Sequence, residues 1–250
     1  MLRRAYANLF IPLAGLSSAL LLLLVPAVSL AGTGGGGLSG GSSTSTTTVR
    51  VHRANRTETA SGDGITFRAV ASGVLTWKTR FSGTTPARDA GRVVDIERTA
   101  KPGSSQWVLA AQATVAQGGT FAVTWRANRA GKLAFRVLLV RSASSASATA
   151  ASPALRVTVF RLSKGTWYGP GFFGHKTACG ITLRRDTIGV ANRSLKCGTK
   201  VSILYDGHSI TVPVIDRGPY SNGAYWDLTQ ATAQALRMTE TSRIGTLFPT

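Results

Sequence analysis

The stretch VIDRGPYSNGAYWDLT, residues 214–229, holds two aspartates, Asp216 and Asp227, separated by residues that turn a chain. The protein has 250 residues, of which ten are acidic and 29 are lysine or arginine, for a formal net charge of +19. Two carboxylates this close in so basic a chain have two explanations. They form a catalytic pair, or one is an ion-pair partner and the other caps a helix.

The residues around this stretch predict a small β domain with one helix. The segments KVSILY and HSITVPVID alternate as strands do, and the Asp206-Gly207 pair between them is a strong hairpin signal. The segment TQATAQALRM, residues 229–238, has apolar residues at helical spacing. Either Thr229 or Asp227 is placed to be the N-cap of that helix.

Residues 49–160 are predicted to form an antiparallel β-sandwich of the Ig-like kind. Roughly seven short segments with a two-residue apolar alternation are separated by turn-forming residues. The segments are GITFRAVASG, VLTWKTRF, VVDIERT, QWVLAAQATV, TFAVTWRA, KLAFRVLLV and ALRVTVFR. The low-complexity stretch 142–152 is predicted to be a long loop before the last strand, and His52 is interpreted as a solvated side chain.

The N-terminus predicts export. Arg3 and Arg4 precede a long apolar run that ends in small residues, the pattern of a secretory signal peptide over residues 1–31. An uncleaved anchor is the alternative, because the apolar run is nearly long enough to span a bilayer. Residues 32–48, GTGGGGLSGGSSTSTTT, predict a flexible linker. We expect an extracellular, cell-wall-associated protein that contacts the membrane only through the signal segment.

Export determines how the cysteines and the charge are interpreted. The chain has two cysteines, Cys179 and Cys197, and in an exported protein such a local pair is expected to form one disulfide. A metal site would need more ligands than the nearby His175, so neither a metal nor a cofactor is predicted. Diffuse positive charge favours polyanions, which outside the cytoplasm means anionic wall polymers rather than nucleic acid. The sandwich is then a spacer or a wall-binding module.

Four motifs in the last third of the chain resemble those of RlpA-like (rare lipoprotein A) proteins. They are WYGPGFFGHKTACG, GVANRSLKCGTKVSI, ITVPVIDRGPY and WDLTQATAQAL, in that order, over roughly residues 164–248. Proteins of this family are exported, act on peptidoglycan and contain a double-psi β-barrel related to that of expansins. The resemblance implies such a barrel over residues 161–250, with one short helix and a groove for glycan strands.

The resemblance also implies a chemistry. Lytic transglycosylases of the RlpA type, which act at the septal ring, cleave between glycan sugars without water and leave a 1,6-anhydro end. Asp216 matches the aspartate of the family's DRG motif and is expected to be the principal acid and base, with Asp227 in support. One carboxyl group can serve as acid and then as base, so a second is not obligatory. An ion pair of Asp216 with the adjacent Arg217 is the structural alternative.

Two positions depart from the family pattern. The chain has Ile181 where enzymes of the family commonly carry a glutamate, and Asn192 where they commonly carry a histidine. An isoleucine cannot transfer a proton, so Asp216 replaces that glutamate or the protein cleaves nothing. Asp186 is a further candidate, unless it pairs with a neighbouring arginine. The function is therefore predicted to be lytic transglycosylation, with a non-catalytic, expansin-like peptidoglycan-binding or wall-loosening protein as the alternative.

Five further residues are candidates for binding the glycan. Trp167, Tyr168 and Tyr220 could stack on sugar faces, although aromatic residues of a small barrel often belong to its core. Thr177 matches a polar position that lines the groove of expansin-like barrels. His175 is a candidate because it is the one histidine of this neighbourhood.

Overall fold

The computed structural model describes residues 50–140 and 150–249, and the architecture given below concerns these residues. The predicted signal peptide (1–31) and linker (32–48) lie outside them, as does most of the loop predicted at 142–152. Within the described ranges, no helix is both long and apolar enough to cross a membrane.

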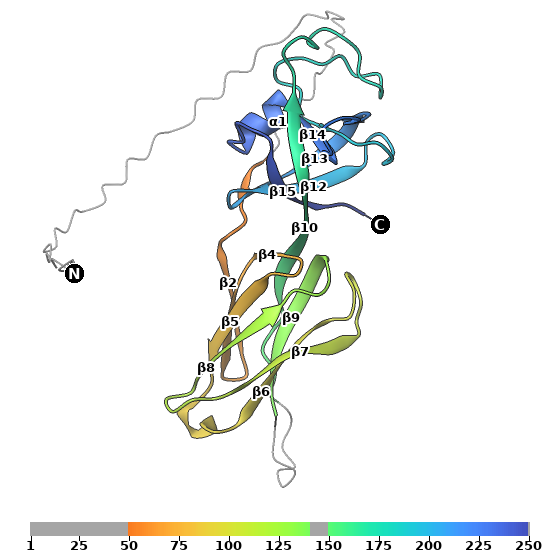
Figure 1. The fold of residues 1–250 in the computed structure, drawn as a ribbon. Helices are drawn as coiled ribbons and strands as arrows, with labels where there is room; N and C mark the ends of the chain where they lie inside the picture. Colours follow the sequence, from red (N-terminus) through yellow and green to blue (C-terminus); the bar gives the residue numbers. More distant parts are fainter. Residues whose placement is uncertain (1–49, 141–149, 250) are drawn as a thin grey trace, which may run out of the picture. The chain divides into compact units, whose positions relative to one another are not determined.

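The N-terminal part is a two-layered β structure, as predicted (Figure 1). One layer is an antiparallel sheet in the order β2-β3-β5-β8, and the other runs β10-β9-β6-β7 with the short β4 added on β10. The strands are β2 (Thr57–Gly62), β3 (Ile65–Val70), β4 (Ser72–Val74), β5 (Lys78–Thr84), β6 (Val93–Thr99), β7 (Trp107–Thr114), β8 (Thr120–Arg126), β9 (Gly131–Leu139) and β10 (Leu155–Tyr168). The pairing of β4 with β10 is parallel, whereas the sequence predicted antiparallel pairing throughout.

The alternation seen in the sequence places one face of each strand in a shared core. Aromatic rings dominate it: the Phe81 and Phe135 rings lie 4.9 Å apart, and the Trp125 ring is 5.1 Å from that of Phe135. Pairs at such distances stabilise a fold beyond the area that they bury. The predicted strand VLTWKTRF is shortened, because Thr76 has a φ of 73° and β5 therefore begins at Lys78.

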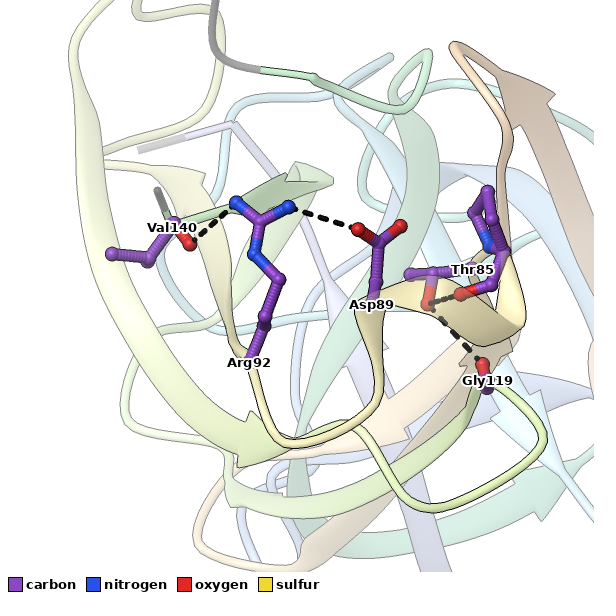
Figure 2. A network of polar contacts seen from close by, with 6 residues as sticks. Thr85, Asp89, Arg92, Gly119 and Val140 are labelled. Atoms are coloured by element: carbon purple, nitrogen blue, oxygen red, sulfur yellow. Dashed lines mark hydrogen bonds and ion pairs between the residues drawn. The ribbon is translucent and has the colours of Figure 1, made fainter. Parts of the chain in front are cut away.

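A short 3-10 helix, η1 (Ala87–Asp89), is fixed by polar contacts on the rim of the sandwich (Figure 2). Arg92 donates from Nη1 to Asp89 Oδ1 at 2.9 Å and from Nη2 to the carbonyl oxygen of Val140 at 3.1 Å. Asp89 is buried, and a buried carboxylate requires such a partner. Its charge is therefore engaged within the sandwich.

The C-terminal part is a closed barrel. Its strands follow the order β14-β11-β13-β12-β15-β10, and the parallel pairing of β10 with β14 joins the two ends. The new elements are β11 (Val190–Ala191), β12 (Lys200–Tyr205), β13 (His208–Asp216), β14 (Trp226–Thr229), α1 (Gln230–Ala235) and β15 (Ser242–Leu247), and a further strand, β1 (His52–Arg53), pairs with β13. The hairpin at Asp206-Gly207 is confirmed, since Tyr205 pairs with His208 across it.

The strand β10 runs without a break through residues 160 and 161, where the sequence predicts a domain boundary. Its first half pairs with β9, and its second half pairs with β15 and β14 (Figure 1). Two separate hydrophobic clusters lie on either side of that point in the sequence, one over residues 65–159 and one over 190–244. The division into two domains remains a prediction.

The helix α1 begins at a threonine cap. Thr229 is extended, and its hydroxyl accepts a hydrogen bond from the backbone N–H of Thr232. The Thr232 hydroxyl in turn accepts a hydrogen bond from the N–H of Gly189 at 2.9 Å and donates one to the carbonyl oxygen of Gly189 at 3.0 Å. These bonds connect the helix to the segment that leads into β11. Of the two N-caps that the sequence allowed, the structure uses Thr229, and Asp227 is left for another role.

Candidate active site

Four side chains from four strands form one row across the barrel wall. Strand β11 lies between β13 and β14, and Ala191 on it is paired with Asp216 on one side and with Asp227 on the other. Asp227 is paired in turn with Thr166 of β10. Residues paired across neighbouring strands direct their side chains to the same face of a sheet. We call Asp216, Ala191, Asp227 and Thr166 the carboxylate row.

The spacing of the two carboxylates follows from this register. Neighbouring strands are about 4.8 Å apart, so the backbones of Asp216 and Asp227 lie roughly 10 Å apart across β11. Ala191 contributes only a methyl group between them. Both aspartates are half-buried, whereas Ala191 between them is 2% exposed.

A β-bulge directs Asp216 into the row. Val190 is paired with Val214, but the next residue, Ala191, is paired with Asp216, so Ile215 is an extra residue on β13. A bulge of this kind changes the direction of the side chains that follow it and is frequent next to active sites. Without the shift, Ile215 rather than Asp216 would be the partner of Ala191.

Asp216 is held by backbone groups and not by an arginine. Its Oδ1 accepts hydrogen bonds from the N–H of Ala178 at 2.9 Å and of Arg217 at 2.8 Å. The Arg217 guanidinium is directed elsewhere, to the carbonyl oxygens of Asn192 and Asp216 and to Cys197 Sγ, each at 3.4 Å. Within the described residues Asp216 forms no ion pair, so the structural alternative for this carboxylate is not observed.

Asp227 is in an environment that favours its protonated form. Burial raises the pKa of this carboxyl group, and the charge of Asp216 raises it further. A hydrogen bond from the Thr166 hydroxyl to Asp227 Oδ1, 2.7 Å long, acts in the opposite direction and lowers the pKa. The net shift is upward. The Thr166 hydroxyl also lies 3.3 Å from the carbonyl oxygen of Trp226, and Oδ2 of Asp227 accepts no hydrogen bond from the described residues.

Tyr168 brings a phenol to the same neighbourhood. It lies two residues beyond Thr166 on β10, on the same face of the strand. Burial raises the pKa of this phenol, and Asp216 raises it further through its charge and as an acceptor for the hydroxyl, followed by the charge of Asp227. Yet the buried hydroxyl has no partner at full hydrogen-bond geometry among the described residues, so the contact with Asp216 is an approach rather than a formed bond. The Tyr168 hydroxyl is therefore protonated and remains available to donate a hydrogen bond.

The predicted disulfide is present and lies beside the carboxylate row. Cys179 and Cys197 are bonded, with their Cα atoms 5.8 Å apart. Cys179 follows Ala178, whose N–H binds Asp216, so the bridge anchors the turn that supplies this donor. Thr177 is buried in the same turn, where its hydroxyl accepts from the N–H of Ile181 at 3.3 Å.

The two positions that depart from the family pattern differ in their surroundings. Ile181 is 42% exposed and presents an alkyl group to solvent next to the turn that binds Asp216. Asn192 is 1% exposed, and its Oδ1 accepts from the N–H groups of Ser194 and Leu195 at 3.1 and 3.0 Å. Its side chain therefore shapes a turn and takes no part in proton transfer.

The predicted sugar-binding residues are only partly brought together. Tyr220 is 76% exposed in the loop that follows Asp216, and His175 is exposed near the turn of Thr177. Trp167 is directed away from the row, because it packs against the barrel core and its indole donates to the carbonyl oxygen of Thr239. The binding of sugar by these residues stays a prediction.

Sequence reasoning did not identify Thr166, Ala191 or Phe172 as part of the site. Phe172 is exposed, and its ring centroid lies 6.1 Å from that of Tyr168 in an edge-to-face arrangement. The alternation Thr166-Trp167-Tyr168 was the available signal, since it separates one core residue from two residues on the opposite face. Within the described ranges, no group of three or more His, Cys, Asp or Glu side chains is placed to hold a metal ion.

Comparisons with known proteins concern the segment that forms the barrel. Residues 161–247 match the family described as "Lytic transglycolase". The chain is 39% identical over 83 residues to the "Probable endolytic peptidoglycan transglycosylase RlpA" of Synechocystis sp., covering 32% of this chain and 26% of that protein. It is 41% identical over 75 residues to the protein of the same name from Aquifex aeolicus, covering 29% and 33% respectively.

These matches cover part of each protein. The chain spans between a quarter and a third of the length of these curated relatives. Among solved structures, Streptomyces papain inhibitor has a TM-score of 0.27 and 23% identity, over 34% of this chain and 91% of that one, and nothing about function follows from that likeness. The resemblance of residues 161–247 to RlpA-like proteins of the double-psi barrel type is thus confirmed.

Proposed function

We propose that residues 161–247 cleave peptidoglycan glycan strands as a lytic transglycosylase and that Asp227 is the proton donor. The observation that carries this proposal is a half-buried carboxyl group with a raised pKa, in register with a second carboxylate across a single alanine. The relatives that match this segment are named endolytic peptidoglycan transglycosylases. Their names support the reaction class for this chain.

The reaction needs one residue to give and then take a proton. Asp227 Oδ2 protonates the glycosidic oxygen as the bond from that oxygen to C1 of the muramoyl sugar breaks. The 6-hydroxyl oxygen of the same sugar then bonds to C1 and gives its proton to the Asp227 carboxylate. The products are a free hydroxyl on the leaving sugar and a 1,6-anhydro end, and Asp227 is protonated again without water being consumed.

Asp216 is assigned the supporting role in this proposal. Its carboxylate is held by two N–H groups on the opposite side of Ala191, where it can stabilise positive charge developing at C1. It also helps to keep Asp227 protonated, since its charge raises the pKa of that group. These assignments reverse the order expected from the sequence, in which Asp216 was the principal acid.

Incubation of the purified chain with insoluble peptidoglycan tests the proposal. Soluble products are analysed by mass spectrometry for anhydro-muropeptides, and the protein that pellets with the insoluble material is measured in parallel. We expect both anhydro ends and pelleting. Pelleting without anhydro ends would identify a non-catalytic wall binder, and failure to pellet would remove both functions.

The binding alternative rests on one specific observation. Ile181 is exposed at the position where enzymes resembling this chain commonly have a glutamate, and an alkyl group cannot replace a carboxyl group in proton transfer. A carboxylate row lacking this third acid can still grip a glycan by hydrogen bonds. The two functions use the same carboxylate row and differ only in the products.

The disulfide favours action outside the cytoplasm, and the exposed tyrosine of the site favours a sugar as ligand. Tyr220 offers a flat ring to a sugar, and the Cys179–Cys197 bridge is stable in oxidising compartments. Peptidoglycan lies in such a compartment. We therefore infer an exported protein whose substrate is the glycan strand of the wall.

Replacing Thr166 by valine should shift the pH dependence of the reaction. The hydrogen bond from Thr166 lowers the pKa of Asp227, so its loss raises that pKa further. Activity requires protonated Asp227 and falls as pH rises through this pKa, so the falling limb of the pH–rate profile should move to higher pH. The Thr166→Ser variant keeps the hydroxyl and should keep the wild-type profile. If the falling limb of the Thr166→Val profile stays at the wild-type pH or moves to lower pH, Asp227 is not the acid.

A further inference from the structure

The outward face of the sheet β2-β3-β5-β8 carries cations. Lys78 and Arg80 are exposed on β5, where they alternate with buried residues. The register places Arg126 of β8 directly opposite Lys78, and Arg68 of β3 opposite Ser82, the next outward residue after Arg80. Paired residues share a face, so all four cations project from one side of the sheet. We call Arg68, Lys78, Arg80 and Arg126 the cationic face.

None of these cations has an acidic partner. All ten acidic residues of the chain lie in the described ranges, and the ion pairs among those residues involve other arginines. Arg126 donates to the carbonyl oxygen of Thr76 at 2.9 Å, and this contact leaves its charge uncompensated. The charge of all four side chains on this face is therefore uncompensated by carboxylates.

The acids of the sandwich are engaged elsewhere. Three of them form ion pairs: Glu58 with Arg56 at 2.7 Å, Asp89 with Arg92 at 2.9 Å, and Glu97 with Arg136 at 2.8 Å. The other two accept hydrogen bonds: Asp95 from Gln112 at 2.8 Å, and Asp63 from the N–H of Ala151 at 3.4 Å. Glu58 is paired with Ala69, a buried residue, which puts it on the inward side of β2. The outward face thus has no carboxylate.

A groove of about 550 Å³ runs along the same face. Arg68 and Arg80 contribute to its walls. Most of its other lining residues are short and many carry hydroxyl groups: Thr66, Ser82, Thr84, Thr114, Thr120 and Ala122. Hydroxyl groups between guanidinium groups offer hydrogen bonds to the oxygens of an anion, and the short side chains leave room for a chain to lie along the sheet.

The spacing of the cations suits a repeating anion. Side chains two residues apart on a strand are about 6.7 Å apart, and neighbouring strands are about 4.8 Å apart. Guanidinium groups bind the oxygens of phosphate and of carboxylate in a bidentate manner, so these arginines can hold either anion. The aromatic residues of β3, β5 and β8 are all buried, so among the described residues these strands offer no outward ring for a base or a sugar.

We propose that the cationic face binds a phosphodiester polymer of the cell wall, a chain of small polyols joined by phosphates. Charge complementarity selects a polyanion, and the spacing of about 6.7 Å along a strand suits a chain with an anionic group in every short repeat. The ring of Phe121, which is among the lining residues of the groove, is 4% exposed and offers little surface for base stacking. The disulfide indicates an oxidising compartment, where wall polymers rather than nucleic acids are abundant. The proposal concerns a face outside the carboxylate row and stands independently of transglycosylation.

Isothermal titration calorimetry tests this site. The full chain is titrated with poly(glycerol phosphate) at several salt concentrations. The variant Arg68→Gln/Lys78→Gln/Arg80→Gln should bind about tenfold or more weakly. For this variant, the slope of log K against the logarithm of the salt concentration should be smaller in magnitude by roughly 2, as expected when three phosphate contacts are lost. Arg126 is kept, since it also stabilises the end of its strand.

The matched control removes the same charge elsewhere. Lys132→Gln/Arg156→Gln/Arg243→Gln replaces three exposed cations that form no ion pair with described residues. It should bind the polymer as wild type does, and all three proteins should melt within a few degrees of one another. Equal weakening in both triple variants would overturn the proposal, because it would mean attraction by net charge alone. Equal affinity for polygalacturonate or single-stranded DNA would overturn the preference for a phosphodiester wall polymer.

Discussion

The Asp227→Asn variant should release anhydro-muropeptides about 10²–10⁴-fold more slowly than wild type, the usual contribution of a general acid. Asparagine keeps the shape of the side chain and an oxygen to accept from Thr166, but it has no proton to give to the glycosidic oxygen. Pelleting with peptidoglycan should be unchanged, since the exposed residues around the carboxylate row are intact. The measurement is the initial rate of anhydro-product formation by mass spectrometry.

The stability of this variant separates a catalytic effect from a folding defect. The pKa of Asp227 is higher in the folded chain than in the unfolded one, so the folded chain holds this proton more tightly. The contribution of the group to stability is therefore present at low pH and is lost as pH rises from the unfolded value through the folded value. Above that window the uncharged amide introduced by Asp227→Asn should leave the protein at least as stable as wild type.

A second variant controls for the loss of one negative charge. Asp186 is exposed and forms no ion pair with described residues, so Asp186→Asn changes the net charge equally without touching the carboxylate row. It should retain wild-type activity. If Asp186→Asn is inactive while Asp227→Asn is active, the acid has been misassigned.

Removal of the disulfide should have the largest effect on stability. The bridge closes a loop with a sequence separation of 18, for which the chain-entropy model gives about 3 kcal/mol. The Cys179→Ser/Cys197→Ser variant should therefore show a free energy of unfolding lower by about that amount, or roughly a hundredfold in the folding equilibrium. Urea denaturation monitored by fluorescence measures this difference.

The same variant should also weaken the site. The turn beside Cys179 supplies the Ala178 N–H that binds Asp216, and a less constrained turn holds this donor less firmly. Dithiothreitol should lower the urea midpoint of wild type and leave the midpoint of the serine variant unchanged. A loss of less than about 1 kcal/mol would show that the turn is held by its other contacts, such as that of Thr177 with Ile181.

Local features of the fold were largely predictable from the sequence. Two-residue alternation located most of the sandwich strands, and the Asp206-Gly207 signal located the hairpin, because both depend on residues close together in the chain. The strand β2 (Thr57–Gly62) was missed, since its residues are small or polar and its alternation is weak. The helix cap was narrowed to Thr229 or Asp227, and only the backbone geometry decided between them.

The carboxylate row was beyond prediction from the sequence. It depends on pairings between strands that are distant in the chain, and on β11 (Val190–Ala191), which is too short to carry a periodic signal. The bulge that aligns Asp216 leaves no mark in the apolar pattern. The sequence could not show which of the two aspartates is the acid either, because the pKa of Asp227 depends on burial and on a neighbour from another strand.

The register across β11 sets how far apart the two acids stand, and Ala191 adds only a methyl group between them. A mutation to valine at this buried position would force branched carbons into packed surroundings and displace the neighbouring side chains of the carboxylate row, with both aspartates still encoded. A lineage could lose bond cleavage in a single nucleotide step and keep its wall attachment. Surveys of genomes that count only acidic residues would then mistake binders for enzymes, and the identity of this one small residue would tell them apart.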